Sequence, residues 1–134
     1  MNILLKLLFK TQKYKTIDIR INDSIYKAKI ADNFIKRAAG LMFFPKLGKN
    51  DALLIYFGRE FYPGIWMYNM KFPIDIVWLD SEFFVADFKE MLAPCSSIFK
   101  CKVYYPSSKA RYVLEMPTGT IKKEKIKKRS KIKI

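Results

Sequence analysis

Residues 61–80, FYPGIWMYNMKFPIDIVWLD, contain the run that decides the fold. The part at 74–79, IDIVWL, is apolar at both odd and even positions, with Asp75 as the one exception. Successive side chains of a strand point to opposite faces of a sheet, so this pattern predicts a strand that is buried on both faces. Pro73 stands directly before the run and disfavours helical conformation at Phe72, which favours extended structure here.

Segments with strand character lie on both sides of this run. They are a hairpin of 16–21 and 24–30, a strand at 52–57, an extended stretch at 65–70, a hairpin of 74–80 and 83–88, and a strand at 110–116. A short helix is expected within 31–44, where Asp32 or Asn33 can cap its start and Gly40 can end it in the left-handed conformation. The pattern predicts an α+β fold, a single compact domain dominated by an antiparallel, barrel-like curled sheet with one or two short helices.

The net charge of +14 is concentrated at the two ends of the chain. Residues 1–16 carry four lysines and no acidic residue, and residues 122–134 carry seven lysines and one arginine against Glu124. Only +3 is left for residues 17–121. We therefore expect a basic amphipathic N-terminal arm at 1–16, one globular domain at 17–121, and a flexible, Lys-rich tail at 122–134.

The two basic ends allow different partners. The tail could remain solvated, or it could make weak, non-specific contacts with nucleic acid or with anionic lipid. The arm could be a short helix that packs on the domain, with a membrane anchor as the alternative. Its lysines and leucines fall on different faces of a notional helix, Lys6, Lys10 and Lys13 on one and Leu4, Leu5 and Leu8 on the other.

The composition excludes several kinds of chemistry. The chain has no histidine, which excludes Ser-His-Asp and Cys-His catalysis and His-ligated zinc. Cys95 and Cys101 are too far apart for a CxxC motif; they could form a local disulfide if the chain turns back, but we expect a reduced pair. No apolar run reaches the roughly 18 to 20 residues of a membrane-spanning helix. We expect a cytoplasmic monomer without cofactor or metal, with peripheral membrane contact as the alternative.

Two acidic residues stand in apolar strands. Asp75 lies within IDIVWL, and Glu115 lies within YVLEM at 112–116. A buried, unpaired carboxylate is costly, so each must find hydrogen-bond donors or take up a proton. Three cations are available as partners, namely Arg37, Lys71 and Arg111.

Four ordered stretches resemble a known family. RAAGLMFFPKL at 37–47, WMYNMKFPIDIVWLD at 66–80, the cysteine pair with YYP downstream, and ARYVLEMPTG at 110–119 resemble, in that order, the motifs of the family catalogued as domain of unknown function 192. The resemblance names no reaction. The matching positions are Arg37, Gly40, Leu41, Met42, Trp66, Met67, Asn69, Pro73, Asp75, Ala110, Tyr112, Leu114, Glu115 and Gly119.

These residues support two hypotheses about function. The first is a binding protein, without catalysis, that holds a small polar ligand in an aromatic-walled pocket. Its candidate residues are Trp66, Asn69, Asp75 and Glu115, with Arg37 or Arg111 as charge partners. In a purely structural interpretation, Asn69 and Asp75 instead satisfy backbone groups of the loop. The second hypothesis is a hydrolase in which Asp75 pairs with Glu115 or Asp80 as acid and base across a common cleft.

Overall fold

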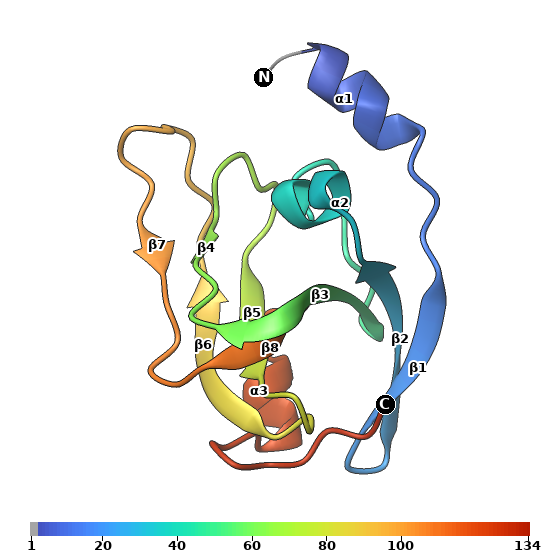
Figure 1. Cartoon of the computed structure of the whole chain (residues 1–134), viewed down its shortest axis with the longest axis vertical. Coiled ribbons are helices and arrows are strands. Elements are labelled where there is room, and N and C mark those ends of the chain that lie inside the picture. The colour runs from blue at the N-terminus through green and yellow to red at the C-terminus, as the bar shows by residue number, and fades with distance from the viewer. Residues whose placement is uncertain (1–2) are drawn as a thin grey trace.

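The computed structural model describes residues 3–134, apart from the side chain of Leu5. Its main feature is a six-stranded sheet in the order β1-β2-β3-β8-β5-β6 (Figure 1). The strands are β1 (Thr16–Ile21), β2 (Ser24–Ala31), β3 (Asp51–Phe61), β5 (Ile74–Leu79), β6 (Val85–Leu92) and β8 (Ala110–Pro117). A two-stranded sheet consists of β4 (Ile65–Trp66) and β7 (Val103–Tyr104), and the helices are α1 (Ile3–Lys10), α2 (Phe34–Ala39) and α3 (Thr120–Glu124).

The large sheet is mixed, and it does not close into a barrel. All neighbouring strands are antiparallel except β2 and β3, which are parallel because α2 and the loop after it return the chain before β3 begins. The predicted α+β class is confirmed, as are both hairpins. The sheet differs from the expected antiparallel barrel, because it contains a parallel pair and leaves β1 and β6 as its outer strands.

Strand β5 has the central place that its sequence predicts. All six of its residues are buried, and it lies between β8 and β6. In the antiparallel ladder with β8, Val77 pairs with Leu114, and Ile76 pairs with Glu115. Paired residues point to the same face of the sheet, so the first pair joins one hydrophobic cluster and the second pair faces the other. We name the two sides the Asp75 face and the Glu115 face after the acidic residue that each carries.

The C-terminal segment, residues 126–134, spans the gap between the two outer strands (Figure 1). The amide of Arg20 in β1 donates to the carbonyl of Lys133 at 2.8 Å, and the amide of Val85 in β6 donates to the carbonyl of Ser130 at 2.8 Å. Ile126 and Ile132 are buried in the cluster on the Asp75 face. The expectation of a flexible tail at 122–134 is therefore wrong. Widely spaced isoleucines anchor this segment to the domain, although its lysines remain exposed.

Helix α1 projects from the opposite end of the molecule (Figure 1). The ring of Phe9 packs on Phe43 and Phe44, with centroids 4.8 and 5.6 Å away. Ile3 and Leu7 remain exposed. Across residues 3–134, no helix combines the length and the apolar character needed to cross a bilayer.

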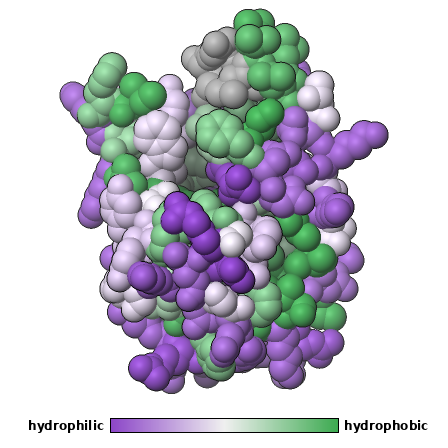
Figure 2. Space-filling model, in the orientation of Figure 1, coloured by the Kyte–Doolittle hydropathy of each residue, from purple (hydrophilic) through white to green (hydrophobic). Residues whose placement is uncertain are grey.

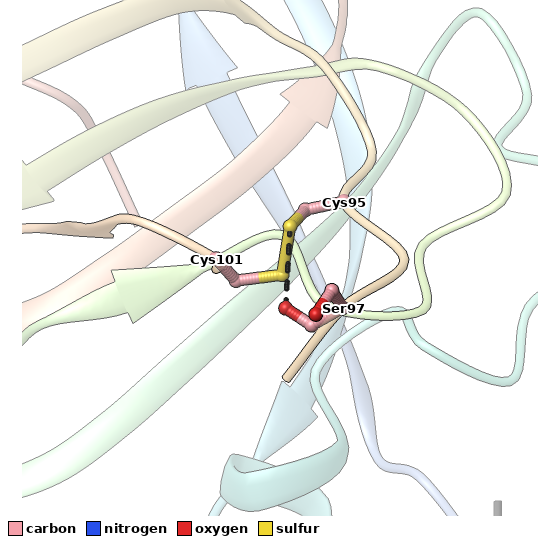
Figure 3. The surroundings of a disulfide bond; sticks show 3 residues. All are labelled: Cys95, Ser97 and Cys101. Atoms are coloured by element: carbon pink, nitrogen blue, oxygen red, sulfur yellow. Dashed lines mark hydrogen bonds between the residues drawn. A yellow bond between two sulfur atoms is a disulfide. The ribbon is translucent and has the colours of Figure 1, made fainter. Parts of the chain in front are cut away.

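A disulfide joins Cys95 and Cys101, whose Cα atoms are 5.7 Å apart (Figure 3). The chain turns back at Ser97, whose carbonyl accepts hydrogen bonds from the amides of Lys100 and Cys101 at 3.0 and 2.9 Å. The expectation of a reduced pair is therefore wrong. The disulfide closes a loop of which Ile98 and Phe99 form the tip.

Candidate functional site

A pocket of about 160 Å³ lies on the Glu115 face of the sheet. Its walls come from the end of α2, from the turn that follows it, from β4 and the loop after β4, and from the strands beneath. We call it the site pocket. Its lining includes Arg37, Gly40, Trp66, Tyr68, Met70 and Glu115.

Helix α2 places one wall of the pocket. Asn33 caps the helix, because its side-chain oxygen accepts a hydrogen bond from the amide of Lys36 at 2.9 Å. The helix ends at Gly40, whose φ of 51° and ψ of −128° belong to a region that only glycine enters at low cost. A Cβ atom at this position would lie 3.5 Å from Oε1 of Glu115. Glycine therefore allows the turn and brings backbone next to the carboxyl group.

Glu115 is the buried polar group of the site. It is 4% exposed, and its Oε2 atom has no hydrogen-bond partner within residues 3–134. Burial raises the pKa of its carboxyl group to about 8. At neutral pH the group is therefore mostly protonated and can donate a hydrogen bond into the pocket.

Aromatic rings and one cation complete the walls. The rings of Trp66 and Tyr68 lie 5.1 Å apart between centroids, at 41° to each other, and both side chains are half-buried. Arg37 donates from Nη1 to the carbonyl of Tyr56 at 3.2 Å. That bond uses one of five guanidinium N–H donors, so Arg37 can also meet a ligand in the pocket. Among residues 3–134, no cluster of three or more acidic or cysteine side chains is placed to hold a metal ion.

Asp75 lies on the other face and serves the fold. Its side chain is completely buried, with Oδ1 accepting a hydrogen bond from the amide of Met91 at 2.8 Å and Oδ2 accepting one from the amide of Ile121 at 2.9 Å. The first bond satisfies a residue of β6 with a positive φ of 53°, and the second holds the start of α3. The expected pairing of Asp75 with Arg37 or Arg111 is wrong, because its partners are backbone amides.

The proposed acid–base pair also fails on geometry. In the ladder of β5 and β8, Asp75 pairs with Met116, whereas Glu115 pairs with Ile76. The two carboxyl groups therefore point to opposite faces of the sheet and cannot share a cleft. Asp80 does not replace either of them, because its Oδ1 accepts hydrogen bonds from two amides of the turn between β5 and β6.

Two further candidates lie outside the pocket lining. Asn69 adopts a left-handed conformation with φ of 56°, and its amide donates to the carbonyl of Cys95 at 2.8 Å. Arg111 donates from Nη2 to the carbonyl of Gly58 at 3.2 Å. Three of the six predicted residues thus line the pocket, namely Arg37, Trp66 and Glu115.

Sequence reasoning did not select Tyr68 or Gly40 as site residues. Tyr68 stands two positions after Trp66 in an extended stretch, so the alternation of side chains could have placed both rings on one wall. For Gly40 the local sequence predicts only the end of a helix. Its closeness to Glu115 depends on a contact between α2 and β8 that local sequence does not encode.

Comparison with known proteins places the chain in a group without an assigned activity. The model of the family DUF192, described as Uncharacterized ACR, matches residues 16–134. The UPF0127 protein TK1120 of Thermococcus kodakarensis is 37% identical over 98 residues, which cover 72% of this chain and 57% of that protein. The UPF0127 protein PYRAB11210 of Pyrococcus abyssi is 34% identical over 106 residues, covering 79% of this chain and 84% of its own length. The chain thus spans little more than half of the first of these relatives.

Two solved structures share the fold. One, from Sinorhizobium meliloti 1021, is described as a "putative transcription regulator"; it has a TM-score of 0.82 at 20% identity, covering 91% of this chain and 95% of its own. The other is a protein of unknown function from Novosphingobium aromaticivorans, with a TM-score of 0.76 at 19% identity, covering 90% and 85%. At such identities the likeness concerns the fold alone.

Proposed function

The chain belongs to the DUF192 family, and we propose that it is a binding protein that holds a small polar ligand in the site pocket. One observation carries this proposal. Glu115 is a buried acid without a partner for Oε2 within residues 3–134. It borders a cavity whose walls also include aromatic rings and a guanidinium group. A ligand that accepts its proton in a hydrogen bond would satisfy a group that the fold leaves unsatisfied.

The chemistry of the walls selects the class of ligand. A protonated Glu115 and the guanidinium of Arg37 are both donors, so the ligand must present acceptor oxygens. A cation would be repelled by Arg37. The volume of about 160 Å³ is close to that of a cavity that holds a benzene-sized molecule. Small carboxylates and small amides meet these conditions, with their apolar part against Trp66.

The test is a titration of the full chain, monitored by NMR of the two tryptophan indole N–H groups. Acetate and acetamide serve as acceptor probes, and methylammonium serves as the cationic control. Trp66 lines the pocket, whereas Nε1 of Trp78 donates to the carbonyl of Pro63 at 2.9 Å in the core. We expect acetate or acetamide to shift the Trp66 signal, to leave the Trp78 signal in place, and to raise the melting temperature.

Two variants make the titration specific. Glu115→Leu removes the buried donor, so the shift at Trp66 should disappear. Asp75→Asn perturbs a buried carboxylate on the opposite face, so it should lower stability and leave the shift unchanged. No response at Trp66 in the wild type, or an equal response in Glu115→Leu, would contradict the proposal.

A further inference from the structure

Two apolar projections stand at the same end of the molecule. One is α1, where Ile3, Leu7 and Leu8 are 75%, 53% and 43% exposed. The other is the tip of the disulfide loop, where Phe99 is 95% exposed and Ile98 is 51% exposed. Both lie at the upper end of the longest axis in Figure 1, and Figure 2 shows hydrophobic surface on each of them, with a notch between.

The two projections are held apart from the core by different means. Phe9 fixes α1 against Phe43 and Phe44, so the residues on the remaining sides of the helix face away from the domain. The disulfide and the turn at Ser97 hold the loop so that a large aromatic ring stands almost completely in solvent. Exposed apolar groups of this size, presented on ordered elements, are typical of an interaction surface.

The charged side chains on the two projections themselves have one sign. The sequence has no acidic residue before Asp18, and none between Glu90 and Glu115. Lys6 and Lys10 are exposed on α1, and Lys100 and Lys102 are exposed at the loop. Apolar tips whose own charged side chains are all lysines match a surface that has a hydrophobic interior and a negative boundary.

We infer that this end of the molecule docks on an anionic lipid bilayer. The apolar side chains of α1 and the tip formed by Ile98 and Phe99 enter the boundary between headgroups and acyl chains, while the lysines meet the lipid phosphates. This inference is independent of the ligand proposed for the site pocket. It also concerns a different surface from the basic C-terminal segment, which lies toward the other end of the molecule (Figure 1).

The experiment is co-sedimentation of the full chain with vesicles of phosphatidylcholine alone and with vesicles that also contain phosphatidylserine. We expect clear binding to the mixed vesicles and weak binding to the neutral ones. Phe99→Asp and the double variant Lys6→Glu with Lys10→Glu should each weaken binding about tenfold, because they remove apolar insertion and charge attraction respectively. All three side chains are exposed, so the melting temperatures should stay within a few degrees of the wild type, by our rough estimate.

A matched control separates this surface from general basicity. Lys122→Glu with Lys127→Glu makes the same change in net charge near α3, at exposed positions. We expect this variant to keep binding within about threefold of the wild type. The inference is overturned if the control loses as much binding as Lys6→Glu with Lys10→Glu, or if phosphatidylserine makes no difference. It is also overturned if the wild type does not bind vesicles but instead forms a dimer or binds duplex DNA, and if Phe99→Asp abolishes that dimer or that DNA binding.

Discussion

Asp75 and Glu115 are buried carboxyl groups one register position apart on neighbouring strands, yet their surroundings differ. On the Asp75 face, each carboxylate oxygen accepts a hydrogen bond from a backbone amide, and the C-terminal segment seals the cluster. On the Glu115 face, Oε2 lacks a partner within the described chain, and the group borders a cavity. Burial of an acid is therefore not what marks a site. The absence of a partner beside accessible space is the more informative feature.

The difference follows from how each group avoids the cost of a buried charge. Asp75 keeps acceptor oxygens directed at two amides that would otherwise be unsatisfied, so it joins β6 and α3 to β5. Oε2 of Glu115 has no such donor among residues 3–134, and burial raises the pKa of the group to about 8, so it remains neutral by holding its proton. One residue stabilises the fold, and the other keeps a donor available for a ligand.

The largest effect is expected on the Asp75 face. Asp75→Ala removes two hydrogen bonds to a carboxylate and leaves the amides of Met91 and Ile121 without partners, which should cost about 4 kcal/mol of unfolding free energy. Urea denaturation at neutral pH would measure the loss. A cost below about 1 kcal/mol would show that Asp75 is not the anchor that its contacts indicate.

The pH dependence of stability should report Glu115. Its pKa is raised in the folded state, so between about pH 5 and 8 the unfolded chain loses a proton that the folded chain keeps. Stability must then fall as pH rises through this window, by about 4 kcal/mol. Glu115→Gln cannot titrate and should show a nearly flat profile. Denaturant titrations at several pH values would measure both slopes, and equal slopes would contradict the assignment.

Other acids should not obscure that window. Burial would raise the pKa values of Asp87 and Glu124, but the hydrogen bonds that they accept lower these pKa values overall. Among those bonds, Asp87 accepts from the amide of Ser107 at 2.8 Å, and Glu124 accepts from the hydroxyl of Tyr26 at 2.5 Å. A lowered pKa contributes stability that is present above the unfolded value and is lost only as pH falls below it. Their effect therefore belongs to the acid limb of the profile.

The C-terminal segment offers the next test of the Asp75 face. Ile132 is 1% exposed and belongs to its hydrophobic cluster, so Ile132→Ala should cost about 2 to 3 kcal/mol. Ile134, 44% exposed in the same segment, is the matched control, and Ile134→Ala should change stability by less than about 0.5 kcal/mol. Thermal and urea unfolding of the two variants would decide. If both substitutions had equally small effects, the interpretation of residues 122–134 as a flexible tail would be supported again.

Local pattern was enough to predict part of this architecture. Both hairpins, the buried strand at 74–79 and the capped helix before Gly40 follow from alternation, turn residues and a cap, each found within about fifteen residues. The faces of Asp75 and Glu115 depend on the register between β5 and β8, strands separated by 30 residues, which no local pattern specifies. The high charge of the last residues favoured the prediction of a flexible tail. Two buried side chains, Ile126 and Ile132, are nevertheless enough to anchor a segment whose lysines are exposed.

The smallest effect concerns Asn69, which was a site candidate in the sequence. It lies in the loop that carries Trp66 and Tyr68 to the site pocket, but its φ of 56° gives a backbone reason for its identity. Asparagine tolerates the left-handed conformation, whereas alanine pays about 1 kcal/mol there. Asn69→Ala should therefore lower stability by about that amount, and Asn69→Gly should stay within about 0.5 kcal/mol of the wild type. Both variants should retain the acetate or acetamide response at the Trp66 indole. If both variants are stable and both lose that response, the Asn69 side chain belongs to the site. Asn69 would then be a binding residue and not only a structural residue of this loop.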